Sequence, residues 1–525
     1  MIQIDKNIAK SITLTFIVSI IIISIFYQIP VNFKFTDSTS MRVHTATSNS
    51  LSDFVAGNYG DSAHPPLIFI LYKIYFQFLD PFNEFLVSLP TFFFFISSIT
   101  ILFYVTMKLF GLAQAFLVIS LFIANNLMLK YVAGIENMFL FLFFAILSFY
   151  FFYKSFILND EKSKWFLVTS NVLMVWSYHA AYFILIGQFS FLLIHRKKEL
   201  FSTKNLRYVI TFFVLSFPIL AQTVISLLDD SITKSPINVY TYSNINFFEN
   251  IIINIYPGID NLFLNKFKLL LLILISATII FATIATFMKN DKNKIVVYYL
   301  VPFLIIIPFL LNTRAYYPRY NVAFYWLIFI TISNCITFSK KIIFKISKDK
   351  LLTIITLIFI ILFVFMNSYI AAKNNIINTN LRIRNSFSFN EMTSTLLEND
   401  YDLVLLMGED YVTHLLKYNL VKTVDRNLEN LFYLYNQGQN ISYKDKSILY
   451  IDSYKYSDFL FLNEYFDKYD KSTLNVLVFS EIKQSTENDE NKLWQYVNHN
   501  CNIKMNSLII HPYRNSTLFS CYFEN

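Results

Sequence analysis

The stretch ENMFLFLFFAILSFYFFYKSF, residues 136–156, decides the fold class of this chain. Its two charged residues, Glu136 and Lys154, stand at or near its ends, and every residue between them is uncharged. A helix needs roughly 20 mostly apolar residues to cross the hydrocarbon core of a bilayer, which is the length of this stretch. We therefore predict a membrane-spanning helix at 136–156.

The composition of the whole chain agrees with this prediction. Of its 525 residues, 55% are hydrophobic and 15% are charged, whereas about 25% of residues are charged in soluble domains. These values exclude an ordinary soluble protein and indicate a polytopic α-helical membrane protein with about 11 transmembrane helices. The other predicted spans are 10–29, 85–107, 111–129, 165–177, 179–195, 207–228, 264–288, 295–311, 321–338 and 351–371.

Basic residues in the short loops predict the orientation of these spans, because Lys and Arg collect on the cytoplasmic side. Lys6 and Lys10 place the N-terminus in the cytoplasm, and alternation then puts every later basic cluster on that side. These clusters lie at Lys108 and at 154–164, 195–200, 289–294 and 340–350. We expect a multi-pass protein of the cell membrane. Its extracytoplasmic segments are 30–84, 229–263, 312–320 and everything after 372.

The C-terminal part differs in character from the rest, so we expect a transmembrane domain at 1–374 and a soluble domain at 375–525. Residues 376–525 carry a net charge of −5, which leaves +13 for the remainder of the chain. Apolar runs at 401–408, 447–453 and 474–480 predict buried strands with helices between them, and 507–523 predicts a hairpin. This alternation suggests an extracytoplasmic α/β domain. A disulfide between Cys501 and Cys521 is one alternative there, and two free thiols are the other.

The first outer loop contains HPPLIFILYKIYFQFL, residues 64–79. The part from Pro65 to Leu79 is too short for a comfortable span, and it predicts a helix at the outer membrane interface. Proline fits the first turn of a helix, where its missing N–H group has no cost. His64 has two interpretations. It fixes the start of this helix, or it contacts a phosphate at the helix N-terminus, where free N–H groups favour anions.

Asp37 also has two interpretations. It follows the first predicted span by a few residues and stands in TDSTS, which is rich in helix-capping residues. The structural interpretation is therefore an N-cap. The functional interpretation is a general base, because partial desolvation at the membrane edge raises the pKa of a carboxyl group toward a useful range.

Arg314 and Arg319 lie in the shortest outer loop, NTRAYYPRYN. They either reach toward the lipid head groups, with Tyr317 and Tyr320 in an aromatic belt, or clamp a phosphate with their planar guanidinium groups. Several polar residues are expected on this same outer membrane face. Residues that only reach toward the head groups could lie on either face. The shared face predicts an outward-facing polar cavity, lined by Glu136, His179, Tyr317 and Tyr320.

These residues together resemble the GT-C superfamily of membrane glycosyltransferases, in the branch of protein O-mannosyltransferases and aminoarabinose transferases. The resemblance covers about residues 10–340. It rests on an acidic residue after the first span, HPPL, Glu136, SYHAAY at 177–182 and RAYYPRYN at 314–321. Many relatives have an Asp-Glu pair in the first loop, whereas Asp37 is followed by Ser38, which leaves Asp37 as the acidic candidate.

The resemblance implies a glycosyltransferase that uses a polyprenyl-phosphate-linked sugar, either a hexosyl- or a pentosyltransferase. The donor phosphate would lie against Arg314, Arg319 and His64, while Asp37 would deprotonate a lipid, glycan or protein acceptor. The arginines would stabilise the leaving phosphate. No cofactor and no nucleic acid is expected. No acidic or His cluster has convincing metal-ligand spacing, although a divalent metal stays an open alternative.

Two other functions compete with this one. A transporter or flippase for a lipid-linked sugar would share the basic outer cavity, but it should show paired repeats or broken helices near the midplane. No such symmetry stands out in the sequence. A non-catalytic membrane assembly subunit would use its C-terminal domain to bind a partner, and loss of Asp37 would leave activity intact.

Overall fold

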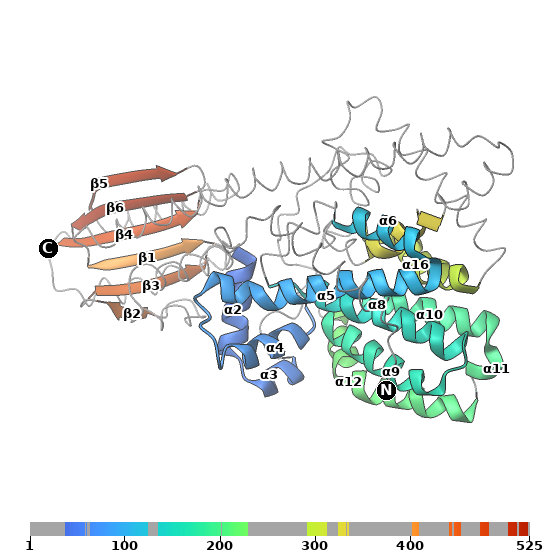
Figure 1. Cartoon of the computed structure of the whole chain (residues 1–525). Coiled ribbons are helices and arrows are strands. Elements are labelled where there is room, and N and C mark those ends of the chain that lie inside the picture. The colour runs from blue at the N-terminus through green and yellow to red at the C-terminus, as the bar shows by residue number, and fades with distance from the viewer. Residues whose placement is uncertain are drawn as a thin grey trace, which may run out of the picture. The chain divides into compact units, whose positions relative to one another are not determined.

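The computed structural model of this chain describes the elements labelled in Figure 1. The described residues are 37–57, 59, 64–123, 135–200, 202–228, 291–311, 324–331, 333–334, 402–408, 440–443, 446–452, 473–481, 502–511 and 514–522. The chain divides into two compact units. The first includes 50–71 and 88–378, and the second includes 33–49, 72–87 and 379–525.

Apolar helices dominate the first unit. The helices are α5 (Glu84–Phe110), α6 (Leu112–Ile123), α8 (Asn137–Phe156), α9 (Glu161–Ser177), α10 (Ala181–His195), α11 (Lys197–Leu200), α12 (Thr203–Leu228) and α16 (Asp291–Leu311). Within the described residues, three stretches are long and apolar enough to cross a membrane: Phe85–Phe110, Asn137–Phe156 and Thr203–Val224. Ala181–His195 is a shorter apolar helix.

A helix therefore lies at each predicted span between residues 85 and 228 and at 295–311. Residues 324–331, within the predicted span at 321–338, are helical as well. The predicted spans at 10–29, 264–288 and 351–371 lie outside the described residues, and so does the expected domain boundary at 374. The total of about 11 spans stays a prediction.

Local signals in the sequence end one helix and begin the next. Asp160 is the N-cap of α9, where its carboxylate accepts hydrogen bonds from the Lys162 N–H (3.1 Å) and the Ser163 hydroxyl (2.6 Å). Such a cap satisfies N–H groups that the first helical turn leaves without intrahelical partners. The α9 helix ends at Ser177 and α10 begins at Ala181, so the close pair of predicted spans is two separate helices.

Aromatic rings fill the centre of this helical unit. Phe149 on α8 packs edge-on against Tyr299 of α16, with ring centroids 5.3 Å apart, and against Trp326 at 5.4 Å. Phe95 on α5 meets Phe139 on α8 at 5.0 Å. All five side chains are at most 1% exposed. Such edge-to-face pairs are a favourable aromatic geometry, and they join α5, α8 and α16 with residues 324–331 in one core.

A polar cluster lies inside the same core. The Ser148 hydroxyl donates to Asn171 Oδ1 (2.6 Å), Asn171 Nδ2 donates to Gln188 Oε1 (2.8 Å), and Gln188 Nε2 donates to the Tyr299 hydroxyl (2.8 Å). These side chains come from α8, α9, α10 and α16. Hydrogen bonds between helices help to hold membrane bundles together, where hydrophobic attraction between helices is weak. Gly187, beside Gln188, lets α10 approach α16 closely.

Two short helices lie in the segment that was predicted to be the first outer loop. The helix α3 (Leu51–Ala56) begins with a reciprocal capping box between Ser50 and Asp53 and ends at Gly57, whose φ is +83°. The helix α4 (Leu67–Tyr75) follows the proline pair, and the Ile70 N–H donates to the carbonyl of Pro66 at 3.0 Å. The helix predicted after HPP is therefore confirmed.

The second unit contains α2 (Asp37–Ser48) and a six-stranded sheet. Its strands are β1 (Leu403–Gly408), β2 (Asn440–Tyr443), β3 (Lys446–Asp452), β4 (Thr473–Glu481), β5 (Asn502–His511) and β6 (Arg514–Tyr522). The strand order is β2-β3-β1-β4-β6-β5.

The register of the sheet explains the sequence pattern. The apolar strand β1 is central and parallel to β3 and β4, with Leu403 opposite Ser447 and Val476, and such strands read as continuous apolar runs. The hairpin β5–β6 continues the sheet antiparallel to β4. The predicted strands and hairpin are confirmed. The predicted intervening helices and Cys501 lie outside the described residues, so the α/β class and the disulfide stay predictions.

Candidate functional site

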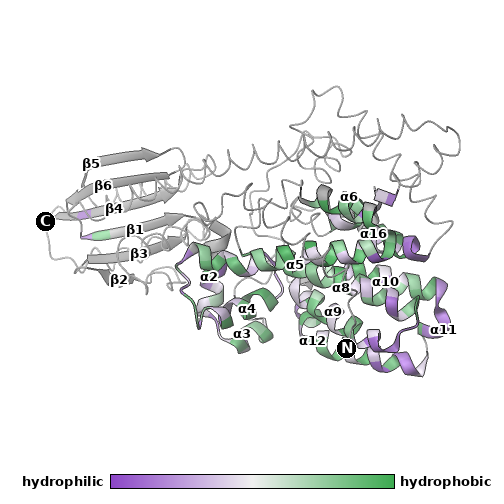
Figure 2. Ribbon diagram, in the orientation of Figure 1, coloured by the Kyte–Doolittle hydropathy of each residue, from purple (hydrophilic) through white to green (hydrophobic). Residues whose placement is uncertain are grey.

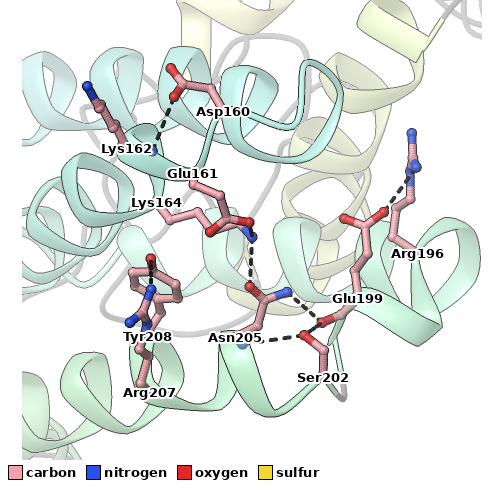
Figure 3. A network of polar contacts seen from close by, with 10 residues as sticks. All are labelled: Asp160, Glu161, Lys162, Lys164, Arg196, Glu199, Ser202, Asn205, Arg207 and Tyr208. Carbon is pink, nitrogen blue, oxygen red and sulfur yellow. Dashed lines mark hydrogen bonds and ion pairs between the residues drawn. The ribbon is translucent and has the colours of Figure 1, made fainter.

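In the first unit, charged residues gather at one end of the helices, and several of the predicted site residues lie at the opposite end. Charged residues gather where α8 ends, α9 begins, α10 ends and α12 begins (Figure 3). Figure 2 shows the same concentration of hydrophilic residues on α11, against mostly hydrophobic helices elsewhere in this bundle. We call this the basic end.

Specific contacts hold the basic end together. Lys164 is 7% exposed, and its Nζ donates to Glu161 Oε1 (2.6 Å) and to Asn205 Oδ1 (2.9 Å). Arg196 Nη1 pairs with Glu199 Oε1 at 3.0 Å. A buried lysine needs an anionic partner and hydrogen-bond acceptors, because an isolated ammonium group is costly to desolvate. The contact between Lys164 and Asn205 fixes the start of α9 against the start of α12.

Those predicted cytoplasmic clusters that the structure describes meet at this basic end. It contains residues from the clusters at 154–164 and 195–200. The start of α16 reaches the end of α5, since Lys292 Nζ donates to the carbonyl of Leu109 at 2.9 Å and lies over the Tyr153 ring. The shared end agrees with the predicted alternation of spans. The side of the membrane on which it lies stays a prediction.

His64 is fixed at the other end of the bundle through its backbone. The Tyr59 hydroxyl donates to the carbonyl of His64 at 2.6 Å, and Gln222 Nε2 of α12 donates to the Tyr59 hydroxyl at 3.0 Å. Tyr59 also packs against Phe69 of α4, with ring centroids 5.6 Å apart. The His-Pro-Pro turn is therefore held by the C-terminal part of α12. The imidazole of His64 is half-buried.

His179 belongs to the same end. It lies in the short turn between α9 and α10, half-buried, and its ring stacks on Tyr182 with centroids 6.2 Å apart. The Tyr182 hydroxyl shares a hydrogen bond of 2.8 Å with the Thr223 hydroxyl. Thr223 is adjacent to Gln222, which contacts Tyr59. The structure thus links His179 and His64 through one stretch of α12, as their predicted common face requires.

Glu136 opens α8 at this end and is 8% exposed. It occupies the N-cap position, yet its side chain makes no capping hydrogen bond. Its backbone N–H donates to the Thr91 hydroxyl of α5 at 3.4 Å. The carboxylate therefore lies among buried groups without taking the capping role that a residue at this position usually has.

The other predicted site residues are not placed by these contacts. Asp37 is the first residue of α2 in the second unit, and the described part of it is its backbone. Arg314, Arg319, Tyr317 and Tyr320 lie outside the described residues. The roles predicted for these five residues stay predictions.

Three buried polar residues escaped the sequence-based prediction. Arg42 and His44 of α2 are 4% and 3% exposed, although α2 reads as a polar loop. Asn137, at the start of α8, is 1% exposed. Asn137 directly follows Glu136, a predicted site residue at the start of a predicted span, and this position is the signal that could have identified it. Among the described residues, no group of three or more His, Cys, Asp or Glu could hold a metal ion.

Comparison with known proteins identifies the fold. No model of a known protein family matches the chain, and no curated protein matches it in sequence. The structure of ArnT from Cupriavidus metallidurans bound to undecaprenyl phosphate aligns with 97% of this chain and 98% of the ArnT chain, with a TM-score of 0.54 and 8% identity. Apo ArnT matches over the same shares, with a TM-score of 0.56 and 10% identity.

The oligosaccharyltransferase of Archaeoglobus fulgidus, in complex with Zn and sulfate, is less similar. It aligns with 77% of this chain and 61% of the oligosaccharyltransferase chain, with a TM-score of 0.44 and 10% identity. The chain therefore has the fold of ArnT. The two ArnT structures agree with the fold expected from the resemblance to aminoarabinose transferases.

Proposed function

We propose that this protein is a glycosyltransferase that moves a sugar from a polyprenyl-phosphate-linked donor to an acceptor at the outer face of the cell membrane. The observation that carries the proposal is the ArnT fold over 97% of the chain, because one of the two ArnT structures is bound to undecaprenyl phosphate. A fold by itself hosts many functions, so the residues of the site must supply the chemistry.

His64 is a suitable contact for the donor phosphate. It stands directly before the proline pair that opens α4, and the first turn of a helix presents free N–H groups to an anion. The hydrogen bond from Tyr59 to the His64 carbonyl holds this turn in place (2.6 Å). Arg314 and Arg319 would complete the phosphate site with planar, bidentate donors.

The reaction needs one proton transfer and one bond exchange. An acceptor hydroxyl or amine attacks the anomeric carbon, the bond from that carbon to the phosphate oxygen breaks, and Asp37 takes the acceptor proton. The negative charge develops on the leaving polyprenyl phosphate, where the two arginines and His64 stabilise it. Nothing in this sequence of steps requires a cofactor. The acceptor is a lipid, glycan or protein.

Two further assignments belong to this proposal. The C-terminal domain lies outside the cytoplasm, and the basic end of the bundle faces the cytoplasm and its anionic lipids. The transferred sugar is a hexose or a pentose. A transporter or flippase, or a non-catalytic assembly subunit, would leave the donor chemically unchanged.

Mass spectrometry of polyprenyl-phosphate lipids tests the proposal. The strains are wild type, a deletion, and the deletion complemented with either the wild-type chain or Asp37→Asn at equal protein level. We expect one polyprenyl-phosphate sugar to accumulate in the deletion and with Asp37→Asn. Accumulation in the deletion alone would remove Asp37 as the base and favour transport or assembly. No accumulation in either strain would contradict a lipid-linked donor.

A further inference from the structure

The amide of Asn137 is buried without a hydrogen-bond partner. Asn137 is the first residue of α8 and is 1% exposed, and neither its Nδ2 nor its Oδ1 has a hydrogen-bond partner in the described part of the chain. Buried side-chain amides in folded proteins normally have a partner, because a desolvated amide without one is unfavourable. Such a group in the native state therefore needs an explanation.

The N-terminus of α8 offers further donors beside this amide. The helix has 20 residues, and its first N–H groups have no intrahelical acceptor. Glu136 holds the N-cap position, yet its side chain makes no capping hydrogen bond. Side chains in a helix lean toward its N-terminus, so the amide of Asn137 lies at the same end as these N–H groups.

The mixture of groups selects the chemistry of a ligand. Backbone N–H groups donate, the Asn137 amide both donates and accepts, and the Glu136 carboxylate accepts when it is ionised. A phosphate or another anion would be repelled by this carboxylate. A sugar hydroxyl both donates and accepts, so neighbouring hydroxyls of one sugar match this mixture.

We propose that the N-terminus of α8 binds the sugar of the donor and that Asn137 is a specificity-determining residue, whose amide exchanges hydrogen bonds with a sugar hydroxyl. The inference rests on the proposed glycosyltransferase function. It is consistent with the placement of α8, whose first residues lie at the end of the bundle that also holds His64 and His179, opposite the basic end.

The decisive variant is Asn137→Leu, which keeps the shape of the side chain and removes its polar atoms. Without a sugar this change removes an unpartnered buried amide, so the melting temperature should stay the same or rise. With a sugar it removes a hydrogen bond. We expect the transfer rate at low donor concentration to fall about tenfold, the factor that corresponds to 1.4 kcal/mol.

Ser155→Ala is the matched control on the same helix. Ser155 is 1% exposed, its hydroxyl also lacks a partner among the described residues, and it lies near the opposite end of α8. Removing this hydroxyl should leave the melting temperature the same or higher and the transfer rate unchanged. The control separates the loss of any buried polar group from the loss of one that faces the sugar.

The assay uses membranes of the deletion strain that contain equal amounts of each full-length variant and their own acceptor. The donor is the polyprenyl-phosphate sugar isolated from that strain, and its initial rate of loss is followed by mass spectrometry. A tenfold slower Asn137→Leu, with an undiminished melting temperature and an unaffected Ser155→Ala, supports the proposal. A wild-type rate for Asn137→Leu, or a rate loss accompanied by a lower melting temperature, overturns it.

The wild-type and Asp37→Asn membranes distinguish a failure of the sugar subsite from a failure of the proposed function. If wild-type membranes consume the donor and Asp37→Asn membranes do not, a normal rate for Asn137→Leu refutes the sugar subsite alone. If wild-type membranes consume no donor, the proposed function fails and the subsite fails with it.

Discussion

The contact between Gly187 and α16 gives the sharpest stability prediction. A Cβ atom added at Gly187 would lie 2.2 Å from the carbonyl oxygen of Tyr298 and 2.9 Å from its carbonyl carbon. Both are backbone atoms, so no side-chain rotation can relieve the overlap. We predict that Gly187→Ala forces α10 away from α16 and weakens the hydrogen bond from Gln188 to Tyr299 (2.8 Å).

Opposing effects set the magnitude. Overpacking of a well-packed site costs typically about 1–3 kcal/mol, and a hydrogen bond between membrane helices contributes on average about 0.6 kcal/mol. Alanine is favoured over glycine inside a helix by about 1 kcal/mol, which offsets part of this loss. We therefore expect Gly187→Ala to lower the free energy of unfolding by about 0.5–2.5 kcal/mol.

Unfolding of the purified protein in mixed detergent micelles, followed by circular dichroism, measures the effect. Ile186→Leu is the matched control, because Ile186 is 46% exposed on the same helix and its change should be neutral. The sign decides the outcome. A Gly187→Ala protein as stable as wild type, or more stable, would mean that α10 and α16 are not in contact here.

Three further changes test other contacts. Asp160→Ala should lower the stability of the purified protein by about 1 kcal/mol in the same unfolding assay, because α9 loses its N-cap. The hydroxyl of Ser163 lowers the pKa of the Asp160 carboxyl below its ordinary 3.8. The contribution of the ionised cap is therefore complete above pH 3.8 and is lost as the pH falls through the lowered pKa. Gly57→Ala should destabilise by about 1 kcal/mol, since a φ of +83° is favourable for glycine and strained for alanine. Gln222→Leu should raise the donor concentration needed for half-maximal transfer with little change in the maximal rate, because Tyr59 loses its donor and the His64 turn loosens.

Most of the described helices and strands followed from the sequence because a local pattern determines each of them. Apolar runs of spanning length predicted the helices of the first unit, and short apolar runs between polar segments predicted β1, β3 and β4. The proline pair predicted the start of α4 at Leu67 within two residues. In each case the residues that determine the element lie within it or directly before it.

The contacts of the site were less predictable because they join distant residues. Gln222 and Tyr59 are separated by 163 positions, and neither belongs to a motif. The close approach at Gly187 depends on the backbone of Tyr298, which no side-chain pattern announces. The helices α2 and α3 were missed because their composition is that of a polar loop, and burial of Arg42 depends on tertiary packing that composition does not encode.

The shared end of the bundle was predictable by alternation of spans. His64, Glu136 and His179 follow one, three and five predicted spans, so alternation puts them on one face. The described helices place all three at the end opposite the basic end. The assignment of roles to these residues needs chemistry that topology cannot supply.

The most direct test of the account is sugar transfer by the purified full-length protein in liposomes. The liposomes contain an isotope-labelled polyprenyl-phosphate sugar, made by labelling the deletion strain, together with an acceptor extract from that strain. We predict that the wild-type protein moves the label to the acceptor fraction with release of polyprenyl phosphate, and that Asp37→Asn does not. Label that stays on the lipid with the wild-type protein, or an equal transfer rate for Asp37→Asn, would contradict the account.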